Sequence, residues 1–325
     1  MNKEQQEKII DPQLRPQSWD EYIGQENIKN NLHILITAAK KRGETFEHLL
    51  FYGPPGLGKT TLAHLIAKET ARNIKITSGP AIEKVGDLAS ILTNLNQGDI
   101  LFIDEIHRLN KNIEEVLYPA MESGVLDIII GKGPSARSIQ LELPAFTLIA
   151  ATTKIAMMSS PLRSRFSGGI FKLEFYTNKE IEKIIKQSAQ KLMIEIDDQA
   201  ITEIAQRSRY TPRTANYFLK RCRDYAEVHG TQLNYETVKK SLELIGVDRE
   251  RLRRIDREVL TTIIDKFNGG PVGLKTIASA THEEIDSIES VVEPYLIQKG
   301  FLELTSRGRV ATQKAYEHLK KDYFS

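Results

Sequence analysis

The chain has little cysteine and no long apolar stretch. Its single cysteine, Cys222, excludes an internal disulfide, and no early apolar run is of the kind that forms a signal peptide or a membrane span. We therefore expect a cytoplasmic protein with no membrane partner. Cys222 falls in a helical pattern, "NYFLKRCRDYAEV", which favours core packing over chemistry.

The chain also lacks an excess of charge of either sign, and it lacks internal repeats. A net charge of +2 argues neither for nor against nucleic acid, so any basic surface has to be local. With 325 residues, 40% of them hydrophobic, the chain is long enough to form two or three globular domains.

Hydrophobic patterns divide the chain into a tail and three domains. Residues 1–13 are polar and predict a flexible tail. Residues 14–177 alternate apolar runs with helical patterns, which is typical of an α/β fold with a mainly parallel sheet. Residues 178–247 have helical periodicity only and open on a capping-box pattern, Thr177 and Glu180, so they predict a small helical domain. Residues 248–325 place helices before two extended runs around a Ser-Arg-Gly-Arg turn, the order of a winged helix.

The strongest motif is "GPPGLGKTT", which runs from Gly53 to Thr61 between the apolar run "LLFY" and a helical pattern. It satisfies the phosphate-binding loop pattern in the context of strand, glycine loop and helix. Glycines let backbone amides face phosphate oxygens, Lys59 reaches the β- and γ-phosphates, and the Thr60 hydroxyl ligates Mg²⁺. The motif predicts an ATP site.

Two adjacent acids end the apolar run "DILFIDEI". Asp104 is predicted to hold the Mg²⁺ shell and Glu105 to orient and deprotonate the attacking water. Thr152 and Thr153 end the next run and bring hydroxyls to the same sheet edge. The alternative is that the two acids are merely solvated at the start of a helix. The phosphate-binding loop in the same chain makes this alternative less favoured than a catalytic role.

Arginines follow in "SPLRSRF" and "YTPRTAN". Arg163 or Arg165 suits the charge of a phosphoryl-transfer transition state, and Arg213, in the helical domain, could sense the γ-phosphate. Each could equally form a surface salt bridge, and the sequence does not say which chain's phosphate it meets.

These motifs, in this order, resemble those of AAA+ ATPases. The resemblance narrows to the RuvB family, motor subunits that drive branch migration of Holliday junctions. It runs from about Leu14 to Leu319 and rests on "ITSGPAIEK", "LYPAMESGVLDIIIGKGPSARSI", "GGPVGL", "EPYLIQKGFL" and "RGRVAT".

The resemblance implies a role for each matching residue. Leu14, Arg15, Ile23 and Tyr176 enclose the adenine and ribose. The phosphate loop comprises Gly56, Gly58, Lys59, Thr60 and Thr61, and the acids Asp104 and Glu105 act beside it. Thr153 is the first sensor, Arg213 the second, and Arg165 the arginine finger offered to the adjacent subunit. Glu122, Ser123 and Gly124 fall near a nucleotide interface.

An apolar hairpin is expected at about 125–143. Its residues Ile128, Ile129, Ile130, Ile139 and Leu141 either fold into the domain's own core or form a partner surface, because an unpartnered edge this rich in isoleucine would invite aggregation. The resemblance implies that RuvA docks there.

DNA contact is expected at the second turn. The run "SRGRVAT" places Arg307 and Arg309 at a tight turn that suits phosphate contacts, although arginines in turns are often merely solvated. The helix "HEEIDSIESVVEPYLI" is too acidic to read the major groove. This sequence departs from the family pattern at Lys154, at Leu304 and in "SGGIF", which has an extra glycine. Leu304 replaces an expected DNA-contacting arginine, so it predicts weaker affinity for duplex DNA.

The resemblance as a whole implies an ATP- and Mg²⁺-dependent motor. It acts as a homo-hexameric ring on duplex arms of Holliday junctions in recombination and DNA repair, with RuvA and with the resolvase RuvC in the same complex. The alternatives are a clamp-loader subunit, whose C-terminal region is a helical collar, and an ATP-switched winged-helix regulator. The "RGRVAT" hairpin argues against the clamp-loader subunit. Glu105 and Arg165 favour repeated ATP hydrolysis, which argues against a regulator that only switches with ATP.

Overall fold

The computed structural model describes residues 12–130, 137–248 and 250–320, and only the backbone of residues 12, 128–130, 137 and 138. This part of the chain forms two compact units, Arg15–Glu174 and a second that runs from Phe175 onward and includes Leu14. Among the described residues, no helix is both long and apolar enough to cross a membrane.

The first unit is built on a parallel five-stranded sheet with strand order β2-β3-β6-β1-β7. The strands are β1 (Leu49–Tyr52), β2 (Ile74–Ser78), β3 (Ile100–Asp104), β6 (Thr147–Thr152) and β7 (Gly169–Lys172). Strands β1, β3 and β6 occupy the middle and are almost wholly buried, which explains their unbroken apolar runs. The predicted α/β fold is confirmed.

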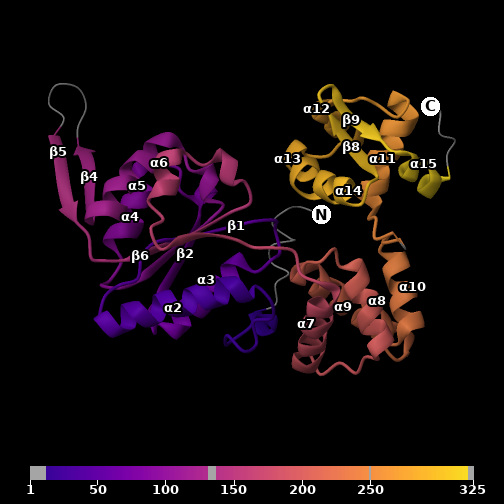
Figure 1. Cartoon of the computed structure of the whole chain (residues 1–325), viewed down its shortest axis with the longest axis horizontal. Coiled ribbons are helices and arrows are strands. Elements are labelled where there is room, and N and C mark those ends of the chain that lie inside the picture. The colour runs from indigo at the N-terminus through magenta and orange to yellow at the C-terminus, as the bar shows by residue number, and fades with distance from the viewer. Residues whose placement is uncertain (1–11, 131–136, 249, 321–325) are drawn as a thin grey trace. The chain divides into compact units, whose positions relative to one another are not determined.

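Helices cover both faces of this sheet (Figure 1). They are α2 (Glu26–Arg42), α3 (Lys59–Glu69), α4 (Val85–Thr93), α5 (Lys111–Ser123) and α6 (Ser160–Ser164), with 3₁₀ turns at Gly79–Ala81, Ile106–Arg108 and Ile155–Met157. Apolar residues of α4, α5 and α6 pack with Leu50, Leu101 and Leu148 of the sheet in one core, while α3 contacts β3 and β6. The covered faces leave the carboxyl ends of the strands free to carry functional loops.

An antiparallel hairpin extends from α5. Strand β4 (Val125–Ile130) pairs with β5 (Arg137–Glu142), with Leu126 opposite Leu141 and Ile128 opposite Ile139. The hairpin stands apart from the parallel sheet, on the side of α4 and α5 (Figure 1). Leu126 is fully buried in the core of the unit, which anchors the base of the hairpin.

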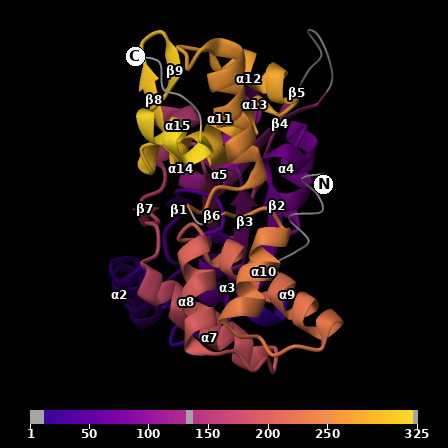
Figure 2. The ribbon, with the colours of Figure 1, turned by 90° about the vertical axis from the view of Figure 1, so that its right-hand side faces the viewer.

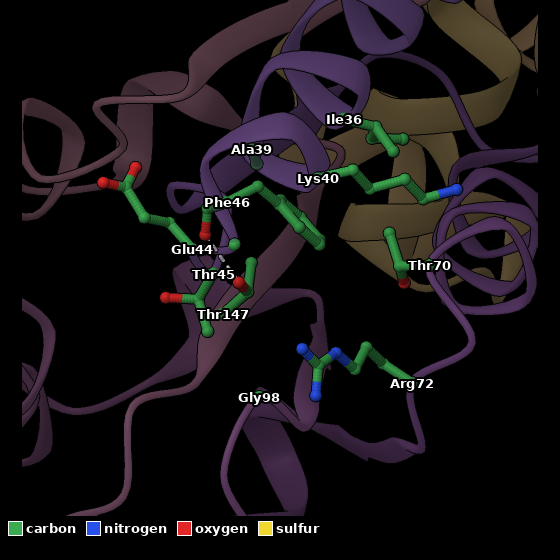
Figure 3. A pocket seen from close by; sticks show the side chains of 11 residues that line it. Ile36, Ala39, Lys40, Glu44, Thr45, Phe46, Thr70, Arg72, Gly98 and Thr147 are labelled. Carbon is green, nitrogen blue, oxygen red and sulfur yellow. Dashed lines mark hydrogen bonds between the residues drawn. The ribbon is translucent and has the colours of Figure 1, made fainter.

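A cavity of about 210 Å³ lies where β1, β3 and β6 begin, at the amino edge of the sheet (Figure 3). On its wall the Thr147 hydroxyl donates to the Phe46 carbonyl at 2.6 Å, and the cationic ends of Lys40 and Arg72 are bound to other residues of the chain. Its lining comprises Ile36, Ala39, Lys40, Gly43, Glu44, Thr45, Phe46, Thr70, Arg72, Gly98 and Thr147. The cavity is therefore distinct from the strand ends that carry the predicted nucleotide residues.

The second unit begins with helices only. After the 3₁₀ turn Pro12–Leu14, it contains α7 (Asn178–Lys191), α8 (Asp198–Arg207), α9 (Pro212–His229) and α10 (Tyr235–Leu244). These four helices gather in one bundle (Figure 2). The predicted capping box is present, since Thr177 and Glu180 bond each other's backbone N–H groups. Cys222 is buried in α9, and burial raises the pKa of its thiol to about 12, which confirms a packing role.

The rest of the second unit has the winged-helix order. It comprises α11 (Arg254–Phe267), α12 (Leu274–Thr281), α13 (Ile285–Ser287), a π-helical turn Ile288–Val292, α14 (Glu293–Gln298), β8 (Leu302–Thr305), β9 (Gly308–Ala311) and α15 (Gln313–Leu319). Strands β8 and β9 form an antiparallel hairpin, and helices and hairpin share one apolar core that includes Leu260, Leu296 and Phe301. The predicted hairpin after helices is confirmed.

Candidate functional site

The phosphate-binding loop connects β1 to the first turn of α3. Its three glycines have backbone angles that other residues rarely adopt, with φ of 141° at Gly53, 82° at Gly56 and 99° at Gly58. A Cβ at Gly53 would lie 2.7 Å from the carbonyl oxygen of Leu173, and one at Gly58 would lie 2.9 Å from the Tyr22 hydroxyl. The loop therefore requires glycine at Gly53 and Gly58, and its amides lead into the electropositive start of α3.

Lys59 is the first residue of α3, and its side chain is folded back over this loop. The residue is 7% exposed, and its Nζ donates to the carbonyl oxygens of Gly53 at 2.7 Å and Pro54 at 3.0 Å. Thr60 and Thr61 follow in the same turn and are half-buried. The ammonium and the two hydroxyls are thus gathered at the helix start, where the sequence predicts phosphates and Mg²⁺.

Strand β3 ends at Asp104, and Glu105 follows with a left-handed φ of 47°. This conformation breaks the alternation of the strand, so two successive acids need not point to opposite faces. Asp104 Oδ1 accepts the backbone N–H of Glu105 at 3.0 Å. The two acids therefore stay at one sheet edge, as the sequence predicts.

Glu105 is held by the end of the neighbouring strand β6. Its Oε2 accepts the backbone N–H of Thr153 at 3.2 Å and the Thr153 hydroxyl at 3.0 Å. His107 Nδ1 lies 3.1 Å from the same oxygen and 2.8 Å from the Thr152 hydroxyl. Burial alone would raise the pKa of Glu105, but the hydrogen bonds from His107 and Thr153 outweigh it and lower that pKa. The carboxylate is thus ionised and oriented.

His107 is a further residue of this cluster that the sequence motifs did not predict. It lies in the 3₁₀ turn directly after the two acids, and a ring nitrogen two residues beyond the proposed water-activating carboxylate was the available signal. Lys154, which departs from the family pattern, donates its backbone N–H to the Thr152 hydroxyl at 3.0 Å. That contact uses the main chain, so it does not depend on the identity of the side chain.

Arg165 and Glu122 were predicted separately, and the structure brings them together within one chain. Arg165 caps the C-terminus of α6, and its Nη2 lies 3.1 Å from Glu122 Oε1. Its Nη1 donates to the Pro161 carbonyl at 2.7 Å, and its guanidinium lies 4.2 Å from the Tyr118 ring centroid. Ser123 ends α5, and Gly124 caps it in a left-handed conformation. Nucleotide contact by these residues stays a prediction.

The residues predicted to enclose the adenine are divided between the two compact units. In the first, Ile23 is half-buried, and Arg15 Nη1 donates to His64 Nε2 at 2.9 Å. Burial and the nearby charge of Arg15 both lower the pKa of His64, so the ring accepts this bond in its neutral form. In the second unit, Leu14 and Tyr176 are buried.

Arg213 also belongs to the second unit, in the first turn of α9. Tyr210, in the connection before α9, contacts one of the residues predicted to enclose the adenine. Its carbonyl accepts the Tyr176 N–H at 3.2 Å. The sensor role of Arg213 stays a prediction.

The hairpin residues predicted to bind a partner differ in exposure. Ile139 is 42% exposed, whereas Leu141 is half-buried and packs against the domain core. Partner contact by either residue stays a prediction. The partial burial of Leu141 follows from its register, since it lies opposite the buried Leu126. The side chains of Ile128, Ile129 and Ile130, and the tip at 131–136, lie outside the described residues.

The two arginines predicted at the wing turn lie in different places. Ser306 and Arg307 form the turn, and Arg307 is exposed. Arg309 lies on β9, where its Nε and Nη2 donate to the two carboxylate oxygens of Glu293 at 2.6 and 3.0 Å. The prediction that both arginines lie in the turn is therefore wrong for Arg309, because the turn has only two residues. Leu304 is 60% exposed on the neighbouring strand.

Comparison with known proteins matches nearly the whole chain. Residues 14–172 match a family model described as the Holliday junction DNA helicase RuvB P-loop domain. Residues 176–248 match the RuvB AAA lid domain, and residues 250–320 match the RuvB C-terminal winged helix domain. The three models follow one another along the chain in the order of the three predicted domains.

Comparisons with individual proteins point to the same family as the three family models. The chain is 58% identical over 315 residues to the Holliday junction branch migration complex subunit RuvB of Dehalococcoides mccartyi (strain CBDB1), which covers 97% of this chain and 90% of that protein. The solved Thermotoga maritima RuvB Holliday junction branch migration motor superposes with a TM-score of 0.87 at 50% identity, over 95% of this chain and 99% of that one. From these matches together with the geometry above, the chain belongs to the RuvB family.

Proposed function

We propose that the chain is an ATP-driven motor that promotes branch migration of Holliday junctions, and that it works as a hexameric ring on duplex arms together with RuvA. The observation that carries this proposal is the Glu105 cluster. A carboxylate bound by Thr153 and His107 lies at the sheet edge shared with a phosphate-binding loop, in a chain that also has a winged helix.

The first unit binds the nucleotide. The loop amides and the Lys59 ammonium face the β- and γ-phosphates, where fixed positive charge offsets the charge of the phosphoryl group. Oxygen ligands suit Mg²⁺, and the Thr60 hydroxyl and the Asp104 carboxylate are the oxygen donors at this edge of the sheet. When bound there, Mg²⁺ would neutralise negative charge on the phosphates.

Glu105 orients the attacking water and accepts its proton. Its lowered pKa keeps it ionised at neutral pH, and the two Thr153 bonds and the His107 ring fix the carboxylate. An oriented base avoids the entropic cost of finding the water during each turnover.

Arg165 serves the ATP of the adjacent subunit. Its fixed positive charge stabilises the negative charge that develops in phosphoryl transfer, an effect worth about 10³- to 10⁵-fold in rate for an arginine supplied this way. Arg213 senses the γ-phosphate from the lid helices and couples hydrolysis to movement of the lid, which continues into the winged helix.

The remaining surfaces hold DNA and partners. Arg307, exposed in the two-residue turn of the wing, contacts phosphates without reading bases, which suits a motor that moves along any sequence. The β4–β5 hairpin, with Ile139 exposed, receives RuvA. The complex works in the cytoplasm, with the resolvase RuvC in the same assembly.

The deciding experiment is ATP-dependent dissociation of a synthetic four-way junction by the purified protein with RuvA. The wild type is expected to separate the junction into duplexes, and Lys59→Ala and Arg165→Ala are expected to fail. Sustained ATP hydrolysis with an intact junction, in the presence of a competent RuvA, would contradict the motor and favour a clamp-loader or switch function.

A further inference from the structure

Three side chains of helix α5 meet the short helix α6, which carries Arg165. Glu114, Tyr118 and Glu122 are spaced four residues apart, so they follow one another along one side of α5. Each of them contacts α6 or the residue that caps it. The sequence motifs gave none of the three a role in positioning Arg165.

The first two contacts fix the start of α6. Ser159 is its N-cap and accepts the Leu162 N–H at 3.2 Å. The same hydroxyl donates to Glu114 Oε2 at 2.6 Å and lies 3.0 Å from the Tyr118 hydroxyl, which itself donates to Glu114 at 3.1 Å. Glu114 is only 5% exposed, so its carboxylate is withdrawn from water and these bonds are strong.

The other contacts fix the guanidinium itself. The Tyr118 ring supports one face of Arg165 at 4.2 Å, and Glu122 holds Nη2 while the Pro161 carbonyl holds Nη1. The Arg165 side chain is 19% exposed, and its Nε is buried without a hydrogen-bond partner among the described residues. The group is thus restrained on two sides and one face, while Nη1 and Nη2 each keep a second N–H for an incoming phosphate oxygen.

We propose that this face of α5, Glu114, Tyr118 and Glu122, positions the arginine finger, and that Glu122 aims its guanidinium. The proposal rests on the proposed function, in which Arg165 serves the adjacent subunit. A long side chain that is already oriented loses less conformational freedom when it meets the transition state. Glu122 is therefore a positioning residue that acts on the neighbouring subunit's ATP.

Measurements of thermal stability and of kcat distinguish a positioning role of Glu122 from a purely structural role. The Glu122 side chain is 56% exposed, so solvent screens its ion pair and the pair contributes little to folding. Glu122→Ala is expected to leave the thermal midpoint unchanged and to lower kcat by up to about 100-fold, the effect of misplacing a reacting group. KM for ATP is expected to stay the same. Glu122→Gln, which keeps an oxygen acceptor, is expected to lose less.

A mixing experiment with the full chain and duplex DNA tests the direction of the effect. Glu105→Gln subunits supply a finger but cannot hydrolyse, and Arg165→Ala subunits hydrolyse only with a neighbour's finger. Each is inactive alone, and their mixture is expected to regain ATPase activity. Adding Glu122→Ala to the Glu105→Gln chain is expected to abolish that gain, whereas adding it to the Arg165→Ala chain leaves the gain intact.

Glu115→Gln is the matched control, because Glu115 is exposed on the same helix and, among the described residues, forms only a long ion pair with Lys111 at 4.0 Å. It is expected to have no effect in either chain. Equal losses from Glu122→Ala in both chains would overturn the proposal, because the residue would then act at its own ATP site. Full activity of Arg165→Ala alone would overturn the trans-acting finger itself, and with it the proposed function of this residue.

Discussion

Asp256→Ala is expected to destabilise the second compact unit strongly. Asp256 is fully buried near the start of α11, and its Oδ2 accepts an Arg209 N–H and the backbone N–H of Arg253, the latter at 2.5 Å. Arg209 precedes α9 and is 6% exposed, with its guanidinium 4.1 Å from the Tyr295 ring centroid. This ion pair therefore ties the lid helices to the winged helix within one unit.

The magnitude follows from what the substitution leaves behind. Burial, reinforced by the nearby charge of Arg253, already lowers the pKa of Arg209 to about 9. Without Asp256 the Arg209 guanidinium stays buried without its counter-ion. Breaking such a buried pair lowers the free energy of unfolding by about 3–5 kcal/mol. For a unit of this size, that loss corresponds to a fall of roughly 6–20 °C in the midpoint of thermal unfolding.

Two probes distinguish the units in one sample. The single tryptophan, Trp19, lies in the first unit, so its fluorescence follows the phosphate-loop domain, whereas far-UV circular dichroism follows helices of both units. Asp256→Ala is expected to move the dichroism transition and to leave the tryptophan transition in place.

Further variants separate the effect of losing the Asp256 charge from the effect of losing its hydrogen-bond acceptor. Asp256→Asn keeps an oxygen acceptor and is expected to cost less, about 1.5–3 kcal/mol. Adding Arg209→Met to Asp256→Ala is expected to recover part of the loss, because no buried charge then lacks a partner. Glu258→Ala, an exposed position on the same helix, is the control. If Asp256→Ala shifted the transition no more than Glu258→Ala, the pair would not join the two parts and the reasoning would be refuted.

Further predictions concern the two units separately. Glu105→Gln is expected to lower single-turnover ATP hydrolysis about 10²- to 10⁴-fold while a fluorescent ATP analogue still binds, because only the base is lost. Burial lowers the pKa of His48 below 6.5, so the folded state disfavours protonation. The free energy of unfolding should therefore fall as the pH drops below 6.5, and His48→Gln should flatten that slope in urea titrations. Arg307→Ala is expected to reduce the salt dependence of duplex binding by about one counterion without loss of stability. Arg309→Ala should instead lower stability by roughly 2–3 kcal/mol in a chemical denaturation curve, because it leaves the buried Glu293 without its partner.

The sequence alone determined the elements and motifs whose signals are local. The apolar runs that form β1, β3 and β6 could be read from the sequence because a strand buried on both faces must be apolar along its length. The loop from Gly53 to Thr61 was readable because its glycines and Lys59 act within nine consecutive residues. The Thr177–Glu180 capping box was readable for the same reason.

Only the tertiary structure decided which side chains meet across the fold. Arg165 pairs with Glu122, 43 positions away in the numbering, and the buried Asp256 pairs with Arg209. The orientation of Glu105 by Thr153 depends on two strands that lie side by side although 48 residues separate the partners. No local spacing encodes such contacts, because they arise when the chain packs helices and strands from distant segments against one another. For the same reason the sequence predicted Arg309 in a tight turn, whereas packing against α14 gave it a carboxylate partner.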